Sequence, residues 1–295
     1  MTDSTDIPVL AIDGGGTRCR FALWDGQSRH VIEAGPANAF TDFDATLACL
    51  KSGLQTLSGA TKLQQKELFG FPAFVGLAGV TSDTIAGRLR ACLPLRHAHY
   101  ADDRPAALRG ALGDQDGMIA HCGTGSFFGA QAGGVYRVAG GWGALLGDEA
   151  SAQWVGRKAL AATLRHADGF GAPSPLTDAL SDRFQGSDGI LLFARGALPD
   201  ALGALAPLVT EHAKNEDPAA RAILMAGADY IANGLDQMGW TPGLPVCLTG
   251  GIGPEYRAYL PTRLQRAVIA PLGVPLDGAL ALARDQAREV ADGYC

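Results

Sequence analysis

Residues 13–17 carry the amino-acid types that phosphate chemistry needs. The segment Asp13-Gly14-Gly15-Gly16-Thr17 places a carboxylate before three glycines and a hydroxyl. Consecutive glycines allow a tight turn and bring backbone N–H groups against an anion. The Asp13 carboxylate could hold a hydrated Mg²⁺ beside a polyphosphate. A plain β-hairpin turn is the alternative, since the spacing matches neither a Walker A loop nor the dinucleotide fingerprint.

A second loop of this kind, Gly123-Thr124-Gly125-Ser126, follows in residues 123–126. In both places a short apolar strand precedes the loop, and a strand, a turn and a third strand follow it. The strands are expected over residues 9–12, 19–24 and 30–34, and over residues 118–120, 127–131 and 135–138. This repetition favours two halves of the same design, each with one phosphate loop.

The remaining elements alternate between helices and strands, which predicts an α/β fold. After the first three strands we expect helices over residues 42–59 and 82–93, strands over 73–77 and 97–101, and a helix opening at Pro105. Later come helices over residues 151–166 and within 175–238, a strand over 246–248, the loop Thr249-Gly250-Gly251 and a terminal helix from Pro275. The expected domains are residues 1–114 and 115–276, with residues 277–295 packing back on the first.

Two adjacent carboxylates, Asp102 and Asp103, stand where a strand ends and a helix begins. Transfer of a phosphoryl group to a hydroxyl needs a base within hydrogen-bond reach of that hydroxyl. Adjacent residues point in different directions, so only one of the two can face a given substrate. Asp102 could equally be the N-cap of the helix that opens at Pro105.

Composition excludes several classes of function. Hydrophobic residues make up 47% and charged residues 18% of 295 residues, and the formal net charge is −6. Without a basic cluster we expect no nucleic acid and no anionic membrane as a partner. The six cysteines are scattered, without a C-x-x-C pair, which indicates buried reduced thiols. The first eight residues do not form a signal peptide and no apolar run reaches ~20 residues, so we expect a cytoplasmic protein.

Together these motifs resemble the sugar kinase, Hsp70 and actin superfamily, and within it the BadF/BadG/BcrA/BcrD branch with its bacterial glucosamine and N-acetylglucosamine kinases. Residues 13–17 match the first phosphate motif, residues 123–126 the second and residues 249–251 the adenosine motif. Residues 105–112 and 278–283 match the two connecting helices. The most specific match is the run Gly-Gly-Trp-Gly-x3-Gly-Asp-Glu-x-Ser over residues 140–151. The resemblance implies two ribonuclease-H-like domains with nucleotide and sugar in the cleft between them.

The resemblance also implies an ATP:sugar phosphotransferase that forms the 6-phosphate of an amino sugar. Such a transfer requires positioning, neutralisation of phosphate charge and one base. ATP would contact the glycine loops, Mg²⁺ would lie on Asp13 through water, Asp103 would be the catalytic base and sugar ligand, and Asn38 and Asp148 would contact the sugar. The ATP and phosphate ligands would be Gly14, Gly15, Gly16, Thr17, Gly123, Thr124, Gly125, Ser126, Gly250 and Gly251. A homodimer is a further expectation from the family.

Several alternatives remain at this level. Phe127 stands where animal N-acetylglucosamine kinases place an asparagine, and Asp148 and Glu149 could attract a cationic 2-amine, so glucosamine is favoured over N-acetylglucosamine. Trp142 could stack on a sugar face or belong to the core. A BadF-type ATPase activator of a dehydratase would need cysteine ligands for an Fe–S cluster. A catalytically silent sugar sensor is the other alternative, and we assign no role to His121 or His166.

Overall fold

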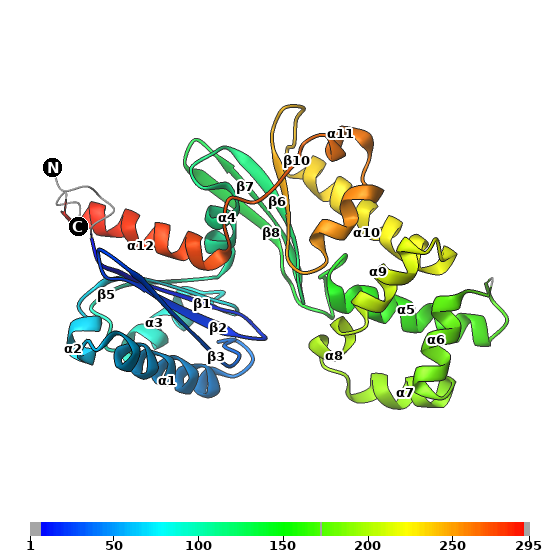
Figure 1. Cartoon of the computed structure of the whole chain (residues 1–295), viewed down its shortest axis with the longest axis horizontal. Helices are drawn as coiled ribbons and strands as arrows, with labels where there is room; N and C mark the ends of the chain where they lie inside the picture. The colour runs from blue at the N-terminus through cyan, green and yellow to red at the C-terminus, as the bar shows by residue number, and fades with distance from the viewer. Residues whose placement is uncertain (1–6, 172, 292–295) are drawn as a thin grey trace. The chain divides into compact units, whose positions relative to one another are not determined.

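The computed structural model of the chain describes residues 7–171 and 173–291, and these divide into two compact units (Figure 1). Unit 1 comprises residues up to 115 together with residues from 271 onward, and unit 2 comprises residues 116–270. Residues 1–6, where we expected no signal peptide, lie outside the described residues, as do residues 172 and 292–295. Residues 271–276, which we expected in the second domain, therefore lie in unit 1.

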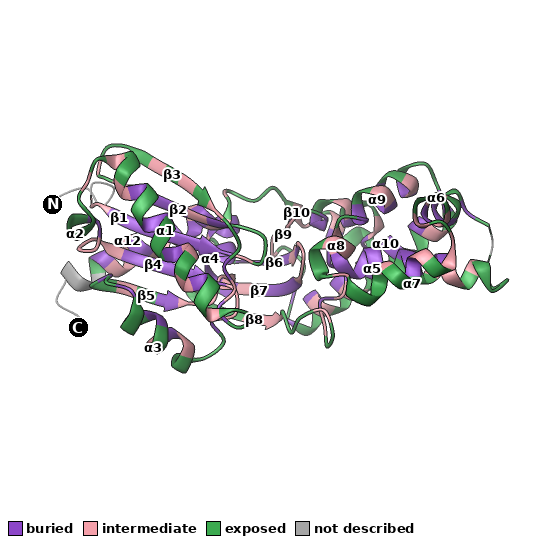
Figure 2. Cartoon of the chain, turned by 90° about the horizontal axis from the view of Figure 1, so that it is seen from below, coloured by how far each residue is buried: buried purple, intermediate pink, exposed green. Residues whose placement is uncertain are grey.

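Unit 1 is built on a five-stranded mixed sheet in the order β3-β2-β1-β4-β5. The strands β1, β2 and β3 form an antiparallel meander, and β4 and β5 add parallel strands on the other side of β1. The bounds are β1 (Val9–Gly14), β2 (Cys19–Trp24), β3 (Arg29–Ala34), β4 (Pro72–Leu77) and β5 (His97–Ala101). Strand β1 is buried along its whole length, which explains its uninterrupted apolar sequence (Figure 2).

Helices cover both faces of this sheet. One face holds Leu10 and Ile12 of β1 against leucines of α1 and α3, and the other holds Val9 and Ala11 against the terminal helix α12. The side chain of Asp42 caps α1 by accepting from the Ala45 N–H at 2.9 Å. The helices are α1 (Phe43–Thr61), α2 (Gln65–Leu68), α3 (Asp83–Cys92), α4 (Arg104–Leu112) and α12 (Pro275–Ala291).

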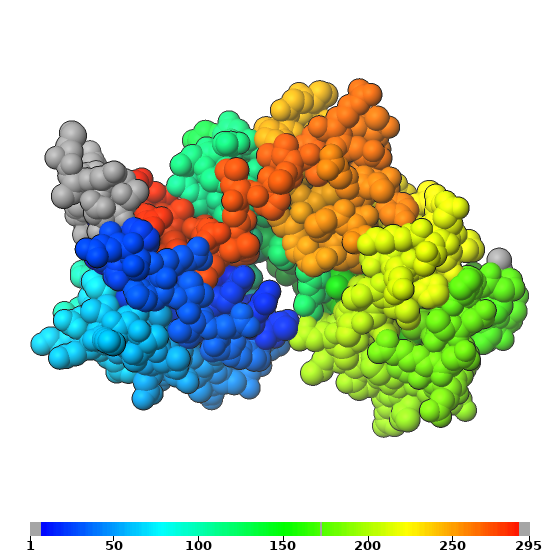
Figure 3. Space-filling model, viewed as in Figure 1, coloured from blue at the N-terminus to red at the C-terminus, as the bar shows by residue number. Residues whose placement is uncertain are grey.

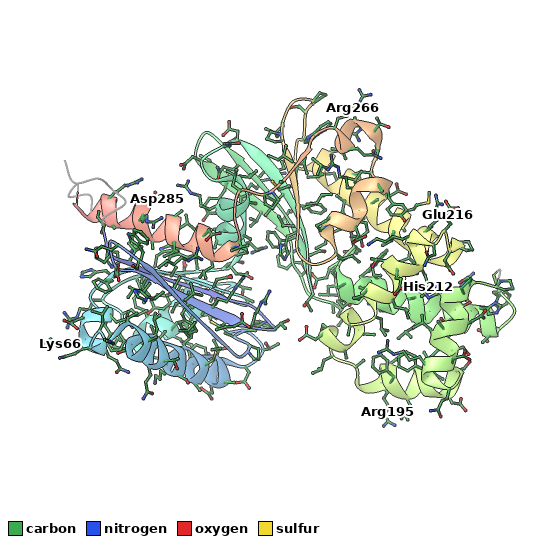
Figure 4. The ribbon with its side chains drawn as sticks, in the orientation of Figure 1. Lys66, Arg195, His212, Glu216, Arg266 and Asp285 are labelled. Atoms are coloured by element: carbon green, nitrogen blue, oxygen red, sulfur yellow. The ribbon has the colours of Figure 1, made fainter. Side chains whose placement is uncertain are left out.

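The helices α4 and α12 pack unusually closely because glycines line their contact. A Cβ on Gly110 would lie 2.3 Å from the Val274 carbonyl oxygen, and one on Gly278 would lie 2.0 Å from that of Ala106. Arg109 of α4 also pairs with Asp285 of α12 at 3.1 Å; Asp285 is labelled in Figure 4. The space-filling view shows the red α12 against the blue strands of unit 1 (Figure 3). The C-terminal helix α12 thus packs in unit 1, together with the N-terminal strands.

Unit 2 repeats the sheet topology of unit 1, in the order β10-β9-β6-β7-β8. Strands β6, β7 and β8 form the antiparallel meander, and β9 and β10 add in parallel beside β6. The bounds are β6 (Gly117–Cys122), β7 (Ser126–Ala132), β8 (Val135–Gly140), β9 (Val246–Thr249) and β10 (Val268–Ile269). The repetition expected from the two glycine loops is therefore present, and each loop joins the first two strands of its meander.

The helices of unit 2 form a layer against one face of its sheet and extend beyond it. Buried residues of α5, α9 and α10 join those of β6 and β9 in one core. The elements are α5 (Ala152–Ala167), α6 (Pro175–Phe184), α7 (Ser187–Gly196), α8 (Pro199–Gly203), α9 (Ala206–Lys214), α10 (Pro218–Gln237), the 3₁₀ helix η1 (Gly253–Tyr259) and α11 (Thr262–Gln265). Cys122 and Cys247 lie buried here and Cys19 in unit 1, as expected, whereas Cys92 is exposed, contrary to that expectation.

Candidate active site

The first glycine loop is the turn between β1 and β2. The Gly15 N–H donates to the Arg18 carbonyl at 2.9 Å, which closes the turn. A Cβ on Gly14 would lie 2.5 Å from the Leu77 side chain, so packing requires glycine there, whereas Gly16 has open space around its Cα. Gly16 and Thr17 are exposed. Packing thus accounts for the first glycine, and the open turn beyond it is accessible to a ligand.

Asp13 precedes this turn and is buried, with 8% of its surface exposed. Its Oδ2 accepts from Nη2 of Arg20 at 2.6 Å. Burial raises the pKa of the Asp13 carboxyl, and the Arg20 charge opposes that rise. Arg20 is not among the predicted site residues, although Asp13 and Arg20 are direct partners across the β1–β2 hairpin. The hairpin register was therefore the signal that could have revealed this pair.

Asp102 and Asp103, just beyond β5, have different surroundings. The Asp102 carboxylate accepts from the backbone N–H of Arg104 at 2.7 Å and pairs with its guanidinium at 2.5 Å. The N-cap residue of α4 is Asp103, so the alternative that Asp102 is the N-cap is wrong; the Asp103 side chain makes no capping hydrogen bond and is partly exposed. Burial, the Asp102 charge and the Asp13 charge, in that order, raise the pKa of the Asp103 carboxyl to about 7. Asp103 is therefore a carboxyl that exchanges a proton near neutral pH, close to Asp13.

Asn38 lies beside the first loop. The Ala37 N–H donates to the Gly15 carbonyl at 2.9 Å, and Asn38 bridges to Ala78 after β4. The Asn38 Oδ1 accepts from the Phe40 N–H at 3.1 Å, so this oxygen holds its own turn. Only its amide N–H groups are then available to contact a sugar.

The second glycine loop joins β6 to β7 in unit 2. The Gly123 N–H donates to the Gly125 carbonyl at 2.8 Å. A Cβ on Gly125 would lie 2.9 Å from Oδ2 of Asp148, so glycine lets that carboxylate lie directly on the loop. The Ser126 hydroxyl is buried and donates to the Glu149 carbonyl at 2.6 Å. We expected this hydroxyl to face phosphate, but its partner shows that it braces the loop internally.

The expected adenosine motif lies against the second loop. Gly250 has φ +80°, and a Cβ there would lie 2.3 Å from the Cys122 carbonyl group. The Ile252 N–H donates to the same carbonyl at 3.1 Å. His121, to which we assigned no role, contacts Thr249 Oγ1 through Nδ1 at 3.1 Å. Burial lowers the pKa of His121 to about 4, so it is neutral at physiological pH. Residues 249–252 therefore pack directly against residues 121–126, and hydrogen bonds join the two segments.

The segment 140–151 carries Asp148 to this loop. Asp148 is 8% exposed, and its Oδ1 has no hydrogen-bond partner among the described residues. Burial raises the pKa of its carboxyl, while the N–H groups of Ser126 and Gly143 oppose the rise. Trp142 is 77% exposed, so the alternative that it belongs to the core is wrong. A buried carboxylate oxygen without a partner is what a hydroxyl-rich or cationic ligand would satisfy.

The predicted site residues therefore fall into two sets. Unit 1 brings together Asp13, Asp103, Asn38 and the first loop, and unit 2 brings together Asp148, the second loop and residues 249–251. Among residues 7–171 and 173–291 no group of three or more His, Cys, Asp or Glu side chains could hold a metal ion. Mg²⁺ commonly uses one or two carboxylates, waters and substrate phosphates, and the Asp13 carboxylate beside the first loop fits such a site. None of the described helices is long and apolar enough to span a membrane.

Comparison with known proteins identifies the family and the fold. The model of the BadF/BadG/BcrA/BcrD ATPase family matches residues 10–269. The chain belongs to this family. It is 26% identical over 278 residues to the glucosamine kinase GspK of Vibrio cholerae, covering 93% of this chain and 95% of that protein. It is 30% identical over 183 residues, or 59% of each chain, to an N-acetylmuramic acid/N-acetylglucosamine kinase of Clostridium acetobutylicum.

Among solved structures, a candidate N-acetylglucosamine kinase of Chromobacterium violaceum superimposes with a TM-score of 0.84 at 31% identity, covering 95% of this chain and 99% of that one. The predicted fold class, α/β with two ribonuclease-H-like domains of the actin-like ATPase type, is thereby confirmed, as is the predicted family.

Proposed function

We propose that this protein is an ATP-dependent kinase that transfers a phosphoryl group to the 6-hydroxyl of an amino sugar. The observation that carries the proposal is the position of Asp103, whose carboxyl lies beyond β5 beside Asp13 and makes no capping hydrogen bond, while that of Asp102 is held by Arg104. The pKa of the Asp103 carboxyl, raised to about 7, supports the same role. A base works best when its pKa lies near the operating pH, because it is then ionised yet still attracts a proton. The related kinases named above act on amino sugars, which supports the same assignment.

In this proposal the residues of unit 1 supply the base and the metal contact. Asp103 accepts the proton of the attacking hydroxyl, and Asp13 holds Mg²⁺ through water. The Mg²⁺ ion would neutralise charge on the transferring phosphoryl group when bound. Arg20 stabilises the buried Asp13 carboxylate by pairing with one of its oxygens. Asn38 directs its amide N–H groups to a sugar oxygen.

The residues of unit 2 supply the second phosphate contact and the adenosine contact. The Gly123 N–H closes the second loop by donating to the Gly125 carbonyl, Thr124 and Gly125 contact phosphate, and Gly250 and Gly251 accommodate adenosine. The reaction requires both sets of residues to act on one ATP and one sugar. Sugar binding should therefore lower the radius of gyration measured by small-angle scattering, and this closure would exclude water from the transfer.

Glucosamine is the substrate that we favour. A free 2-amine is largely cationic near neutral pH and interacts best with a carboxylate within about 4 Å. Asp148 offers a carboxylate whose Oδ1 has no partner among the described residues, and the adjacent Glu149, which hydrogen-bonds Tyr230, adds a second negative charge. Phe127, in contrast, stacks on the His121 ring at 4.9 Å between centroids and offers no hydrogen-bonding group to an acetamide. These observations support glucosamine over N-acetylglucosamine and glucose.

A coupled ADP-release assay with the three sugars at equal concentration tests the proposal. We expect sugar-dependent ADP release with the highest kcat/KM for glucosamine. A kcat/KM for N-acetylglucosamine about tenfold above that for glucosamine, or about 1.4 kcal/mol, would reverse the preference. ATP hydrolysis that no sugar stimulates would contradict the kinase assignment itself.

A further inference from the structure

The backbone around Asp148 is strained. Asp148 has φ +61° and Ala150 has φ +63°, in the left-handed region that residues other than glycine seldom adopt. Such conformations persist only when surrounding contacts hold them, and they concentrate at functional sites. The contacts that hold this segment therefore also determine where the Asp148 carboxylate lies.

Hydroxyl groups hold the segment at three consecutive carbonyls. The Ser151 hydroxyl donates to the Asp148 carbonyl at 2.6 Å, within the same turn. The Ser126 hydroxyl donates to the Glu149 carbonyl at 2.6 Å, and the Tyr256 hydroxyl donates to the Ala150 carbonyl at 2.8 Å. The first two donors are local or belong to the phosphate loop. Tyr256 alone comes from a distant part of the chain.

Tyr256 has no freedom to move its hydroxyl elsewhere. The residue is 0% exposed, and a Cβ on Gly227 of α10 would lie 2.4 Å from its ring. It lies in η1, which follows residues 249–252 directly. The Ile252 N–H donates to the Cys122 carbonyl at the end of β6, so the segment that leads into η1 is joined to the strand that precedes the phosphate loop.

We propose that Tyr256 is a positioning residue that couples nucleotide binding at residues 249–252 to the sugar-contacting carboxylate of Asp148. The inference rests on the proposed kinase function. Nucleotide at residues 249–252 contacts the segment that leads directly into η1, and from η1 the Tyr256 hydroxyl holds the Ala150 carbonyl and the strained backbone beside it. Loss of this hydroxyl leaves a buried carbonyl without its donor, which the backbone can relieve by relaxing away from the left-handed conformation.

Tyr256→Phe removes only the hydroxyl and keeps the ring that fills the space beside Gly227. Tyr100→Phe is the matched control, since the Tyr100 hydroxyl is also buried, in unit 1, and has no hydrogen-bond partner among the described residues. The measurements are KM for sugar and for ATP, kcat, and the Kd for sugar by calorimetry with and without ADP.

For Tyr256→Phe we expect KM for sugar to rise about tenfold with KM for ATP within about twofold of wild type. In wild type and in Tyr100→Phe, ADP should lower the Kd for sugar by at least about fivefold, which is within the usual range of coupling between sites. In Tyr256→Phe, ADP should lower this Kd by less than about twofold. Unchanged KM for sugar and unchanged coupling would overturn the inference. A fall in kcat alone, with both KM values retained, would also overturn it.

Two further outcomes are distinguishable. If wild type phosphorylates no amino sugar, the proposed function fails, and hydrogen exchange of residues 148–151 with and without ADP, which needs no sugar, still tests Tyr256. If Tyr256→Phe does not fold, hydrogen exchange of wild type decides: ADP should slow exchange in residues 148–151 at least about threefold, and an unchanged rate would overturn the inference.

Discussion

Replacement of Asp103 by asparagine should abolish most turnover while making the protein more stable. Turnover should fall by about 10²-fold or more, as removal of a general base usually causes. The stability gain follows from the pKa of Asp103, which is about 7 in the folded protein against an ordinary value of 3.8. The folded state binds this proton more tightly than the unfolded chain, so ionisation of Asp103 above neutral pH opposes folding.

The size of the gain follows from the same two values. A difference of about 3 pH units at about 1.4 kcal/mol each is about 4 kcal/mol when Asp103 is fully ionised. Because Asp103 is partly exposed, solvent screening reduces this, and we expect about 1–3 kcal/mol. The contribution of the wild-type carboxyl is lost as pH rises from about 4 through 7. The advantage of Asp103→Asn should therefore grow over that interval and stay constant above it.

Thermal denaturation of wild type, Asp103→Asn and Asp102→Asn at pH 5 and pH 8 tests this reasoning. Asp103→Asn should melt several degrees higher than wild type at pH 8 and gain less at pH 5. Asp102→Asn breaks the ion pair with Arg104, so it should melt lower while keeping most turnover. A lower melting temperature for Asp103→Asn at pH 8 would refute the argument, and an exchange of the two phenotypes would show that Asp102 is the base.

Three further substitutions test other contacts. Gly250→Ala should lower the melting temperature by several degrees, because Gly250 has φ +80° and its Cβ would lie 2.3 Å from main-chain atoms. Gly251→Ala is the control and should leave the melting temperature unchanged, because a Cβ there meets open space. Equal melting temperatures for the two variants would contradict this reasoning. Arg20→Gln leaves the buried Asp13 charge unpaired and should cost about 3 kcal/mol in chemical denaturation, of which the double variant with Asp13→Asn should recover part. Trp142→Ala should raise KM for sugar about fivefold without changing stability, since the side chain is 77% exposed; an unchanged KM would exclude stacking on the sugar.

The fold was predictable because its signals are local. Alternating strands and glycine loops repeat within short windows, and the apolar run of β1 marks a strand buried on both faces. The Asp42 cap of α1 was also readable, because capping depends on neighbours three residues away. These features need no knowledge of distant contacts.

The details of the site were less predictable because they depend on tertiary contacts. Nothing near Tyr256 in the sequence indicates that its hydroxyl meets Ala150, 106 residues away. We expect from the sequence that the Ser126 hydroxyl faces phosphate. In the structure it donates to the Glu149 carbonyl instead, and this contact forms only when the segment 140–151 packs on the loop, which the sequence does not reveal. The separate surroundings of Asp102 and Asp103 likewise depend on side-chain directions that adjacent positions in a sequence do not reveal.

The close packing of α12 in unit 1 has a consequence for synthesis on the ribosome. Val9 and Ala11 of β1 are covered by residues 276–283, which are translated only after all of unit 2. At about 5–20 residues per second, the intervening segment delays that cover by on the order of ten seconds or more. During this interval one apolar face of the first sheet lacks its helix, whereas unit 2 is continuous in sequence and can complete its core as soon as it emerges. The strands of unit 1 are thus synthesised first, but the core of unit 1 is completed last. A nascent chain stalled before residue 276 would expose the face of β1 that carries Val9 and Ala11 to chaperones or to other chains.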